Sequence, residues 1–392
     1  MSVIKKFIDT SIDAFDTFIR TPKTTTSGKV HLRDALDSKR MMSTVAVALT
    51  PLIIFSIWNT GYQKLSALQA VPGALLSSHP LLGTAPTILN SFLHGLWQFL
   101  PILAVTYAVG LGIEFVFAAL RGHEVNEGFL ISGLLIPLTL PPDIPLWMVA
   151  LGTAFGVIFG KEVFGGTGMN FLNPALTARA FIFFSYPGAI SGDTVWTAVD
   201  GAKDKLVDGF SGATPLALLA TAEGSDPVAM LESAGFSFKT LFLGVMPGSM
   251  GETSVLLCLV GALILVTTRV ASARVMLSMV AGGLAMGILL NLLATPDSPA
   301  YWHLPAYWHL VLGGFAFGAV FMATDPVTGA ATPVGQVIYG FLIGFFAVII
   351  RVLNPAFPEG VMLAILFMNV FAPLIDHFVV EANVRRRLRR VR

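Results

Sequence analysis

Ten apolar stretches constrain the fold of this chain more than any other feature of its sequence. Each stretch has few or no charged residues and approaches the ~20 residues that cross the hydrocarbon core of a bilayer as a helix. Only 12% of the 392 residues are charged, against about 25% in soluble domains. The sequence therefore predicts an all-α, polytopic membrane protein with about ten transmembrane helices, at residues 42–60, 91–120, 127–141, 145–161, 171–187, 253–268, 275–294, 309–324, 334–352 and 360–380.

Proline interrupts several of these stretches, at Pro137, Pro141, Pro145 and Pro174. In a membrane, broken helices occur where neighbouring helices or a water-lined cavity satisfy the freed backbone groups. We therefore expect several broken helices around an interior site. Five stretches lie in each half of the chain, and the halves carry comparable breaks at 173–174 and 325–326. An internal duplication into two five-helix pseudo-repeats is one interpretation, because transporters are often built from repeated halves.

Positive charge is concentrated at the two ends of the chain. Fourteen of the 24 Lys and Arg residues lie in residues 1–40 or 385–392, and basic segments stay on the cytoplasmic side of a membrane. Two cytoplasmic ends require an even number of spans, which places the acidic segment 188–239 outside. The predicted organisation is a cytoplasmic segment 1–41, a first membrane half 42–187, an extracytoplasmic loop 188–239, a second membrane half 240–384 and a basic cytoplasmic tail 385–392.

Composition excludes several classes of function. The single cysteine, Cys258, excludes a disulfide scaffold and cysteine-ligated metal or iron-sulfur chemistry within this chain. A net charge of +1 gives no sign of a nucleic-acid partner. No Gly-x-Gly-x-x-Gly string follows a strand-like segment, so we expect NADH to bind elsewhere. We expect no metal centre and the lipid bilayer as the surrounding medium.

Three carboxylates lie within or at the ends of apolar stretches: Glu114, Asp325 and Asp376. A carboxylate in an apolar surround must pair, bind a cation or take up a proton, so each is a candidate for an ion pathway. Glu114 is the clearest, because apolar residues flank it on both sides. Asp325 and Asp376 are nearer to the membrane interface, where solvation is the alternative interpretation. A hard cation such as sodium prefers carboxylate and carbonyl oxygens.

The most specific motif is the string Asp-Gly-Phe-Ser-Gly-Ala-Thr-Pro at residues 208–215, in the acidic outer segment. Asp, Gly, Ser and Pro are turn-forming residues, and Thr214-Pro215 is typical of the start of a helix. From the residues alone, the motif is a turn that leads into a helix.

This string resembles the flavin acceptor site of a known family, the NqrB subunits of the sodium-translocating NADH:quinone oxidoreductases and their relatives, the RnfD subunits of the Rnf complex. Further strings extend the resemblance across nearly the whole chain. The long segment before the first apolar stretch favours the sodium-pump subunit over the Rnf subunit. These strings are His-Leu-Arg-Asp at 31–34, Glu-Val-Asn-Glu-Gly at 124–128, Lys-Glu-Val-Phe-Gly-Gly-Thr-Gly at 161–168, Asn-Phe-Leu-Asn-Pro-Ala at 170–175 and Asn-Pro-Ala-Phe-Pro-Glu-Gly at 354–360.

The resemblance implies two flavins. A flavin transferase would attach FMN through its phosphate to the hydroxyl of Thr214, and a non-covalent riboflavin would contact Asn170 and Asn173. Three positions apart, these asparagines would share one face of a helix. Helix capping and interhelical hydrogen bonding are the alternative roles of the two asparagines. The other residues of the FMN acceptor motif are Asp208, Ser211, Gly212 and Ala213.

The resemblance also implies a quinone site. In the family, a glycine pair ahead of the matching glutamate lies near the quinone, and the matching positions here include Gly110 and Gly112. Leu111 stands where the second glycine of the pair is expected, so this sequence departs from the pattern. Close helix packing through small residues is the alternative.

Together these features predict a membrane electron-transfer subunit in a bacterial inner membrane, with both chain ends in the cytoplasm. It would pass electrons from FMN through riboflavin to ubiquinone and couple this to sodium export, while a partner flavoprotein subunit oxidises NADH. One alternative is the corresponding subunit of an Rnf-type ferredoxin:NAD oxidoreductase. An alternative of another class is a flavin-free ion channel or secondary transporter, which would have no use for the motif at 208–214.

Overall fold

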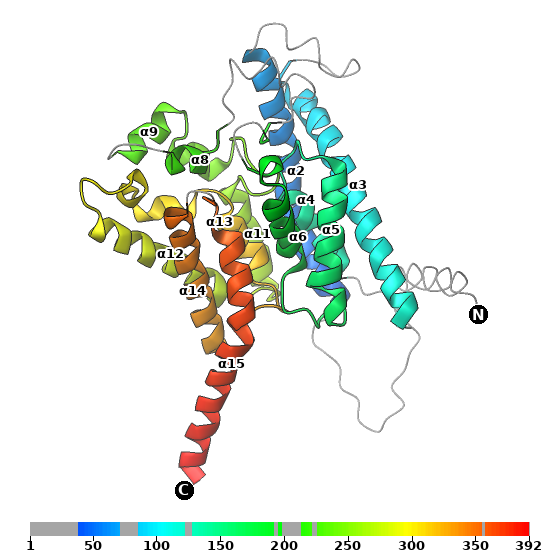
Figure 1. Ribbon diagram of the computed structural model, residues 1–392, viewed down its shortest axis with the longest axis vertical. Coiled ribbons are helices and arrows are strands. Elements are labelled where there is room, and N and C mark those ends of the chain that lie inside the picture. Colours follow the sequence, from blue (N-terminus) through cyan, green and yellow to red (C-terminus); the bar gives the residue numbers. More distant parts are fainter. Residues whose placement is uncertain are drawn as a thin grey trace.

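A computed structural model describes residues 38–70, 85–121, 128–191, 195–197, 213–221, 226–354 and 357–391 (Figure 1). All regular secondary structure within these ranges is helical. The prediction of an all-α polytopic membrane protein is therefore confirmed.

Six helices are long and apolar enough to cross a bilayer. Each contains at least 18 residues once α5 is joined to the short turn η2 that follows it, and 18 residues extend over about 27 Å at 1.5 Å per residue. They are α2 (Ser38–Ala70), α3 (Ile88–Arg121), α5 (Leu146–Gly160) with η2 (Glu162–Phe164), α12 (Ala273–Leu293), α14 (Pro333–Leu353) and α15 (Val361–Val391).

The other four predicted stretches form helices that are too short to span the hydrocarbon core alone. They have 8 to 13 residues each and so extend over about 12–20 Å, less than the ~30 Å of the core. The prediction of about ten spans thus holds for the number and position of apolar helices in the described ranges, but not for their length. The short helices are α4 (Phe129–Leu138), α6 (Pro174–Ser185), α11 (Val255–Thr267) and the continuous segment α13 (Phe315–Phe317) and η6 (Gly318–Met322).

Proline explains two of the short helices. Pro137 lies in the last turn of α4, and Pro174 fixes the start of α6. The chain provides partners for backbone groups beyond α4: Leu138 O accepts from Gly251 N at 2.7 Å, and Leu140 O accepts from Met250 N at 3.2 Å. Broken helices are therefore satisfied by a packed loop, as expected for irregular backbone inside a membrane protein.

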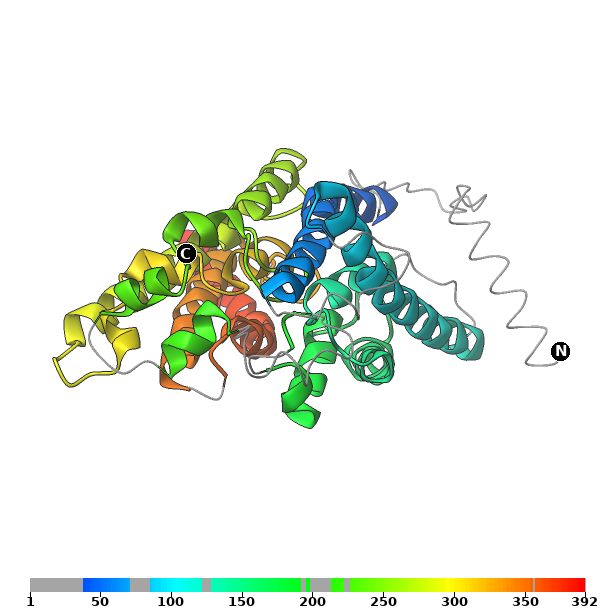
Figure 2. The ribbon, with the colours of Figure 1, turned by 90° about the horizontal axis from the view of Figure 1, so that it is seen from above.

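Viewed from above, the helices of the two chain halves stand side by side (Figure 2). The halves meet where α11 packs against α2 and α15 packs against α6. Helix lengths follow the order long, long, short, long, short in the first half and short, long, short, long, long in the second. The internal duplication therefore stays a prediction, as does the division of the chain into five segments.

Short helices cover one end of the molecule. Figure 1 shows α8 and α9 at the end opposite to the C-terminal end of α15. This arrangement matches the prediction that the acidic segment and the basic tail lie on opposite sides. These covering elements are η3 (Pro187–Ala189), α8 (Pro215–Ala220), α9 (Pro227–Ser233), α10 (Phe238–Leu243), η4 (Ala300–His303) and η5 (Ala306–Leu310).

Candidate functional sites

Asn173 caps the N-terminus of α6. Its Oδ1 accepts hydrogen bonds from the backbone N–H groups of Ala175 at 3.0 Å and Leu176 at 3.2 Å. An asparagine at the N-cap followed by proline at the first helical position is a favourable helix start, because proline has no N–H to leave unpaired there. The capping role considered for this residue is therefore confirmed.

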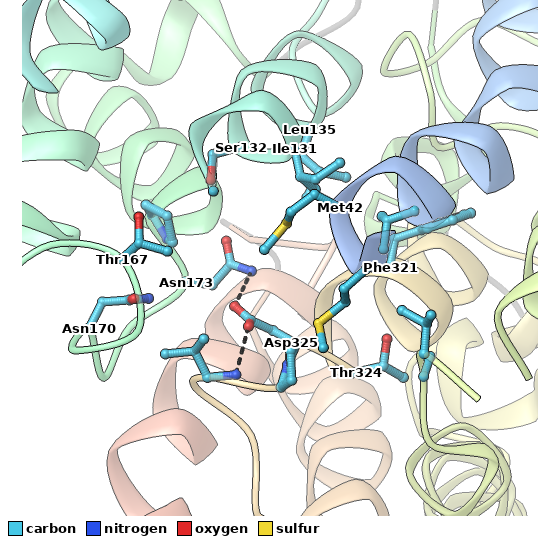
Figure 3. Close-up of a pocket in the computed structure, with 18 of the residues that line it drawn as sticks. Met42, Ile131, Ser132, Leu135, Thr167, Asn170, Asn173, Phe321, Thr324 and Asp325 are labelled. Carbon is cyan, nitrogen blue, oxygen red and sulfur yellow. Dashed lines mark hydrogen bonds between the residues drawn. The ribbon is translucent and has the colours of Figure 1, made fainter. Parts of the chain in front are cut away.

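The same side chain joins the two halves of the chain. Nδ2 of Asn173 donates to Oδ2 of Asp325 at 3.4 Å, and Oδ1 of Asp325 accepts from Val327 N at 3.0 Å (Figure 3). The breaks at 173–174 and 325–326, one in each half, thus meet in space although 152 residues separate them.

A pocket opens beside this contact, and we call it the Asn173 pocket. It has about 810 Å³ of empty volume and an apolar wall with a few polar groups, which is typical of small-molecule sites. Asn170 also lines it, but Nδ2 of Asn170 donates to Leu172 O at 3.0 Å. The lining includes Met42, Ile131, Leu135, Lys161, Thr167, Asn170, Asn173, Phe321, Thr324 and Asp325.

The prediction that Asn170 and Asn173 share a helix face is wrong. Both residues lie in the irregular segment before α6, because Pro174 places the helix start after them. They nevertheless line one pocket, and both are buried. In Figure 3, Asn173 points toward Asp325, while Asn170 lies apart from that pair.

Thr214 caps the N-terminus of α8 at the opposite end of the molecule from the tail. Its Oγ1 accepts from Ala217 N at 3.2 Å, and Pro215 follows at the first helical position. The cap uses a lone pair of the hydroxyl and leaves its proton uncommitted. Thr214 is half-buried and Ala213 is buried. Three residues of the predicted acceptor motif, Asp208, Ser211 and Gly212, lie outside the described residues.

Thr214 lines a second pocket, which we call the Thr214 pocket. Its empty volume is about 670 Å³, within the usual ~300–1,000 Å³ of ligand sites. Aromatic rings form part of its wall: Phe183 and Phe357 pack edge to face with their centroids 4.4 Å apart. The lining includes Arg179, Phe183, Trp196, Thr214, Met246, Ser249, Glu252, Phe357 and Glu359.

One arginine holds two carboxylates in the wall of this pocket. Nη1 of Arg179 donates to Glu252 Oε1 at 2.7 Å, and Nη2 donates to Glu359 Oε2 at 2.6 Å. Nη2 also donates to Ser249 Oγ at 3.3 Å. The Arg179 side chain is only 3% exposed, so the three charges compensate one another within the protein rather than in water.

Burial dominates the protonation of this cluster. In the loop before α11, burial raises the pKa of Glu252 from an ordinary 4.5 to about 8, although the positive charge of Arg179 opposes this shift. The negative charge of Glu359 acts in the same direction as burial. At neutral pH the cluster therefore favours one shared proton over two ionised carboxylates.

Arg179 was not among the residues that the sequence pattern selected. It lies in the predicted apolar stretch 171–187, so the rule that selected Glu114, an ionisable residue inside a span, applies to it equally. Its two partners come from loops at positions 252 and 359, and no spacing rule connects them with α6.

Helix α6 connects the two pockets. Asn173, at its N-terminal end, lines one pocket, while Arg179 and Phe183 line the other. Six to ten residues of helix separate these positions, about 9–15 Å. Electrons tunnel readily between redox cofactors over distances of this order.

Glu114 lies outside both pockets, in a buried ion pair with Lys161. Gly110, one turn earlier on α3, lies against the ring of Phe129, so a side chain there would collide with the ring. This contact favours the packing role for Gly110. Gly112 has open space where a side chain would begin, and neither glycine lines a pocket described above.

Asp376 also lies apart from the pockets. From α15 it accepts hydrogen bonds from Ala331 N at 2.7 Å and Thr332 N at 3.0 Å. It also accepts from the hydroxyl of Thr332, the N-cap of α14. These bonds fix the start of α14, and a role in ion transport stays a prediction for Asp376.

The fold and the pockets define a class: an all-helical membrane protein with two ligand-sized pockets joined by one short interior helix. The chain belongs to the NQR2, RnfD, RnfE family, which it matches over residues 25–385. The family predicted from the sequence motifs is confirmed.

Curated relatives cover nearly the whole chain. The B-type subunit of the Na(+)-translocating NADH-quinone reductase of Ectopseudomonas mendocina (strain ymp) is 50% identical, over 96% of this chain and 93% of the relative. The proteins with the same name in Azotobacter vinelandii and Chromohalobacter salexigens are 49% and 48% identical, over 96% of this chain and 93% and 90% of the relatives.

Proposed function

We propose that this chain is the membrane-embedded NqrB subunit of a sodium-translocating NADH:quinone reductase, an electron-transfer subunit that carries FMN on Thr214 and riboflavin in the Asn173 pocket and delivers electrons to ubiquinone. The names of the relatives support the activity and the sodium coupling. One structural observation carries the flavin assignment. Both predicted flavin-binding strings line a ligand-sized pocket, and the two pockets lie at the ends of the same helix, α6.

The residues of the Thr214 pocket fit a tethered flavin. The hydroxyl of Thr214 faces a pocket with aromatic walls, and its proton is not used by the helix cap. A phosphoester on Oγ1 would leave a lone pair for the bond from Ala217 N. When bound, a flavin accepts and releases one or two electrons. The chain's own contribution is to hold the ring in place: Phe183 and Phe357 offer faces and edges for aromatic packing.

The residues of the Asn173 pocket fit a neutral flavin. Riboflavin has no phosphate and presents amide-like donors and acceptors on one edge, which the amides of Asn170 and Asn173 can match. The apolar side chains of Ile131, Leu135 and Phe321 exclude water around them. This arrangement orients a ring without requiring a charged anchor.

We propose that the ion pathway includes Glu114, Asp325 and Asp376 and that the quinone approaches α3 near Gly112, where the backbone has open space. The partners would be other subunits of the complex, including an NADH-oxidising flavoprotein, together with a flavin transferase and sodium. The chain would lie in a bacterial inner membrane with both ends in the cytoplasm. The relatives' names favour this subunit over its Rnf counterpart.

The test is the Thr214→Ala variant, produced with the rest of the complex in a host that contains the flavin transferase. We expect an FMN-sized mass increase on the wild-type Thr214 peptide, and in-gel flavin fluorescence that the variant lacks. Thr221→Ala, at the other end of α8, is the matched control and should keep its flavin. An unmodified wild-type peptide beside an active transferase would refute the assignment and favour the flavin-free channel or transporter.

A further inference from the structure

The segment 161–168 clamps the end of α5 onto α3. Lys161 forms an ion pair with Glu114 of α3, and the side chains of both residues are 4% exposed. The neighbouring Glu162 pairs through Oε2 with Nη1 of Arg121, also on α3, at 3.5 Å. Two adjacent residues of one motif thus hold two charged residues of one helix.

The same segment forms one wall of the Asn173 pocket. Gly165, Gly166 and Gly168 adopt positive φ of 126°, 97° and 88°, conformations that glycine reaches without steric cost. The resulting tight turn brings Thr167 to the pocket wall that Lys161 also lines. Lys161 therefore lies between two regions, with Glu114 on one side and the pocket on the other.

Electrostatics make Lys161 and a bound cation mutually exclusive at Glu114. The ion pair is neutral, and a sodium ion added to it would leave a net positive charge in a site removed from water, which is costly. Sodium can therefore bind Glu114 only if the ammonium group moves away. A lysine has four flexible methylene groups, so its ammonium can move while its backbone stays in place.

The pocket offers the displaced ammonium a second carboxylate. Asp325 lines the same pocket as Lys161. Its present partners there are the neutral donors Asn173 Nδ2 and Val327 N. Lys161 thus connects two carboxylates, Glu114 and Asp325, that belong to different halves of the chain.

We propose that Lys161 is a tethered counter-ion of Glu114 that competes with the transported sodium ion, and that its ammonium moves into the Asn173 pocket toward Asp325 when sodium binds. The inference rests on the proposed role of Glu114 in sodium handling. Lys161 acts through Glu114 and is a positioning residue.

The test compares Lys161→Gln with wild type in the purified complex. Equilibrium binding of radioactive sodium and the sodium dependence of quinone reduction are both measured. Removing the competing cation should lower the half-saturating sodium concentration by about tenfold, the order expected for one charge next to a partly buried carboxylate. The maximal rate should change less than this concentration. Lys239→Gln, an exposed lysine on α10, should leave both unchanged.

Two further variants keep the proposal testable. Lys161→Arg retains a positive charge that binds carboxylates more firmly, so the half-saturating sodium concentration should rise even if Lys161→Gln fails to assemble. An unchanged or higher half-saturating concentration in Lys161→Gln, or an unchanged one in Lys161→Arg, would overturn the inference. If Glu114→Gln binds sodium as wild type does, the proposed role of Glu114 itself fails. If only Glu114→Gln alters sodium binding, that role survives and the inference about Lys161 is wrong.

Discussion

The Thr214 pocket and the Asn173 pocket lie at opposite ends of α6 and differ in how their walls treat charge. The Thr214 pocket has a buried arginine with two carboxylates, Glu252 and Glu359, in its wall. The Asn173 pocket presents amides and apolar side chains, and its lysine is paired with Glu114. Among the described lining residues, neither wall offers an uncommitted cation that would anchor a phosphate.

This difference agrees with the proposed ligands. The phosphate of FMN is consumed in the ester with Thr214, so its pocket needs no separate phosphate site. Riboflavin has no phosphate at all, so amides suffice. The charged cluster around Arg179 instead connects α6 with the loops at Glu252 and Glu359. We expect it to control the stability of the Thr214 pocket, whereas neutral hydrogen bonds control occupancy of the Asn173 pocket.

The largest effect is expected from Arg179→Met. Removing the arginine leaves two carboxylates buried beside each other, and breaking a buried pair in this way costs about 3–5 kcal/mol. The melting temperature and the yield of the assembled complex should fall sharply. Arg385→Met is the control, because its ion pair with Glu381 is at the surface with the arginine 70% exposed. Such a pair contributes about 0–1 kcal/mol. Equal losses in the two variants would show that the cluster does not stabilise the pocket.

A smaller, pH-dependent effect is expected from Glu252→Gln. The folded-state pKa of Glu252, about 8, lies above its ordinary value of 4.5. The folded chain therefore holds a proton that the unfolded chain has lost, and stability falls as pH rises between these values. The slope is at most ~1.4 kcal/mol per pH unit for one proton. Melting temperatures of wild type should decline from pH 6 to pH 8, and glutamine should reduce this decline. Glu232→Gln, exposed on α9, should decline as wild type does, and so should Glu252→Gln if burial does not hold the proton.

Hydropathy predicted where the apolar helices lie, because burial in lipid requires long apolar sequence whatever the packing. It did not predict their lengths, which depend on proline positions and on loops such as 249–251 that satisfy the broken ends. Local capping was also predictable: Thr214-Pro215 begins a helix as the residue types indicate.

Contacts between the halves were beyond sequence reasoning. Asn173 meets Asp325 across 152 residues, and Arg179 meets Glu359 across 180. Periodicity relates only residues a few positions apart, so it grouped Asn173 with Asn170 on a helix that does not extend that far. The partner of Glu114 was likewise hidden, although Lys161 stood in a motif already selected.

The smallest effect on stability, but a specific effect on flavin content, is expected from Asn173→Ser. Serine keeps an oxygen that can cap α6, so the cost to stability should stay at or below the ~1 kcal/mol of a lost cap. It removes the amide that donates to Asp325 and that we propose contacts riboflavin. Flavin extracted from the denatured complex should therefore contain less riboflavin, while FMN on the Thr214 peptide is unchanged. Asn383→Ser, on the exposed end of α15, should retain both flavins. Full riboflavin content in Asn173→Ser would confine Asn173 to capping, whereas loss of both flavins would show that the two ends of α6 do not act separately.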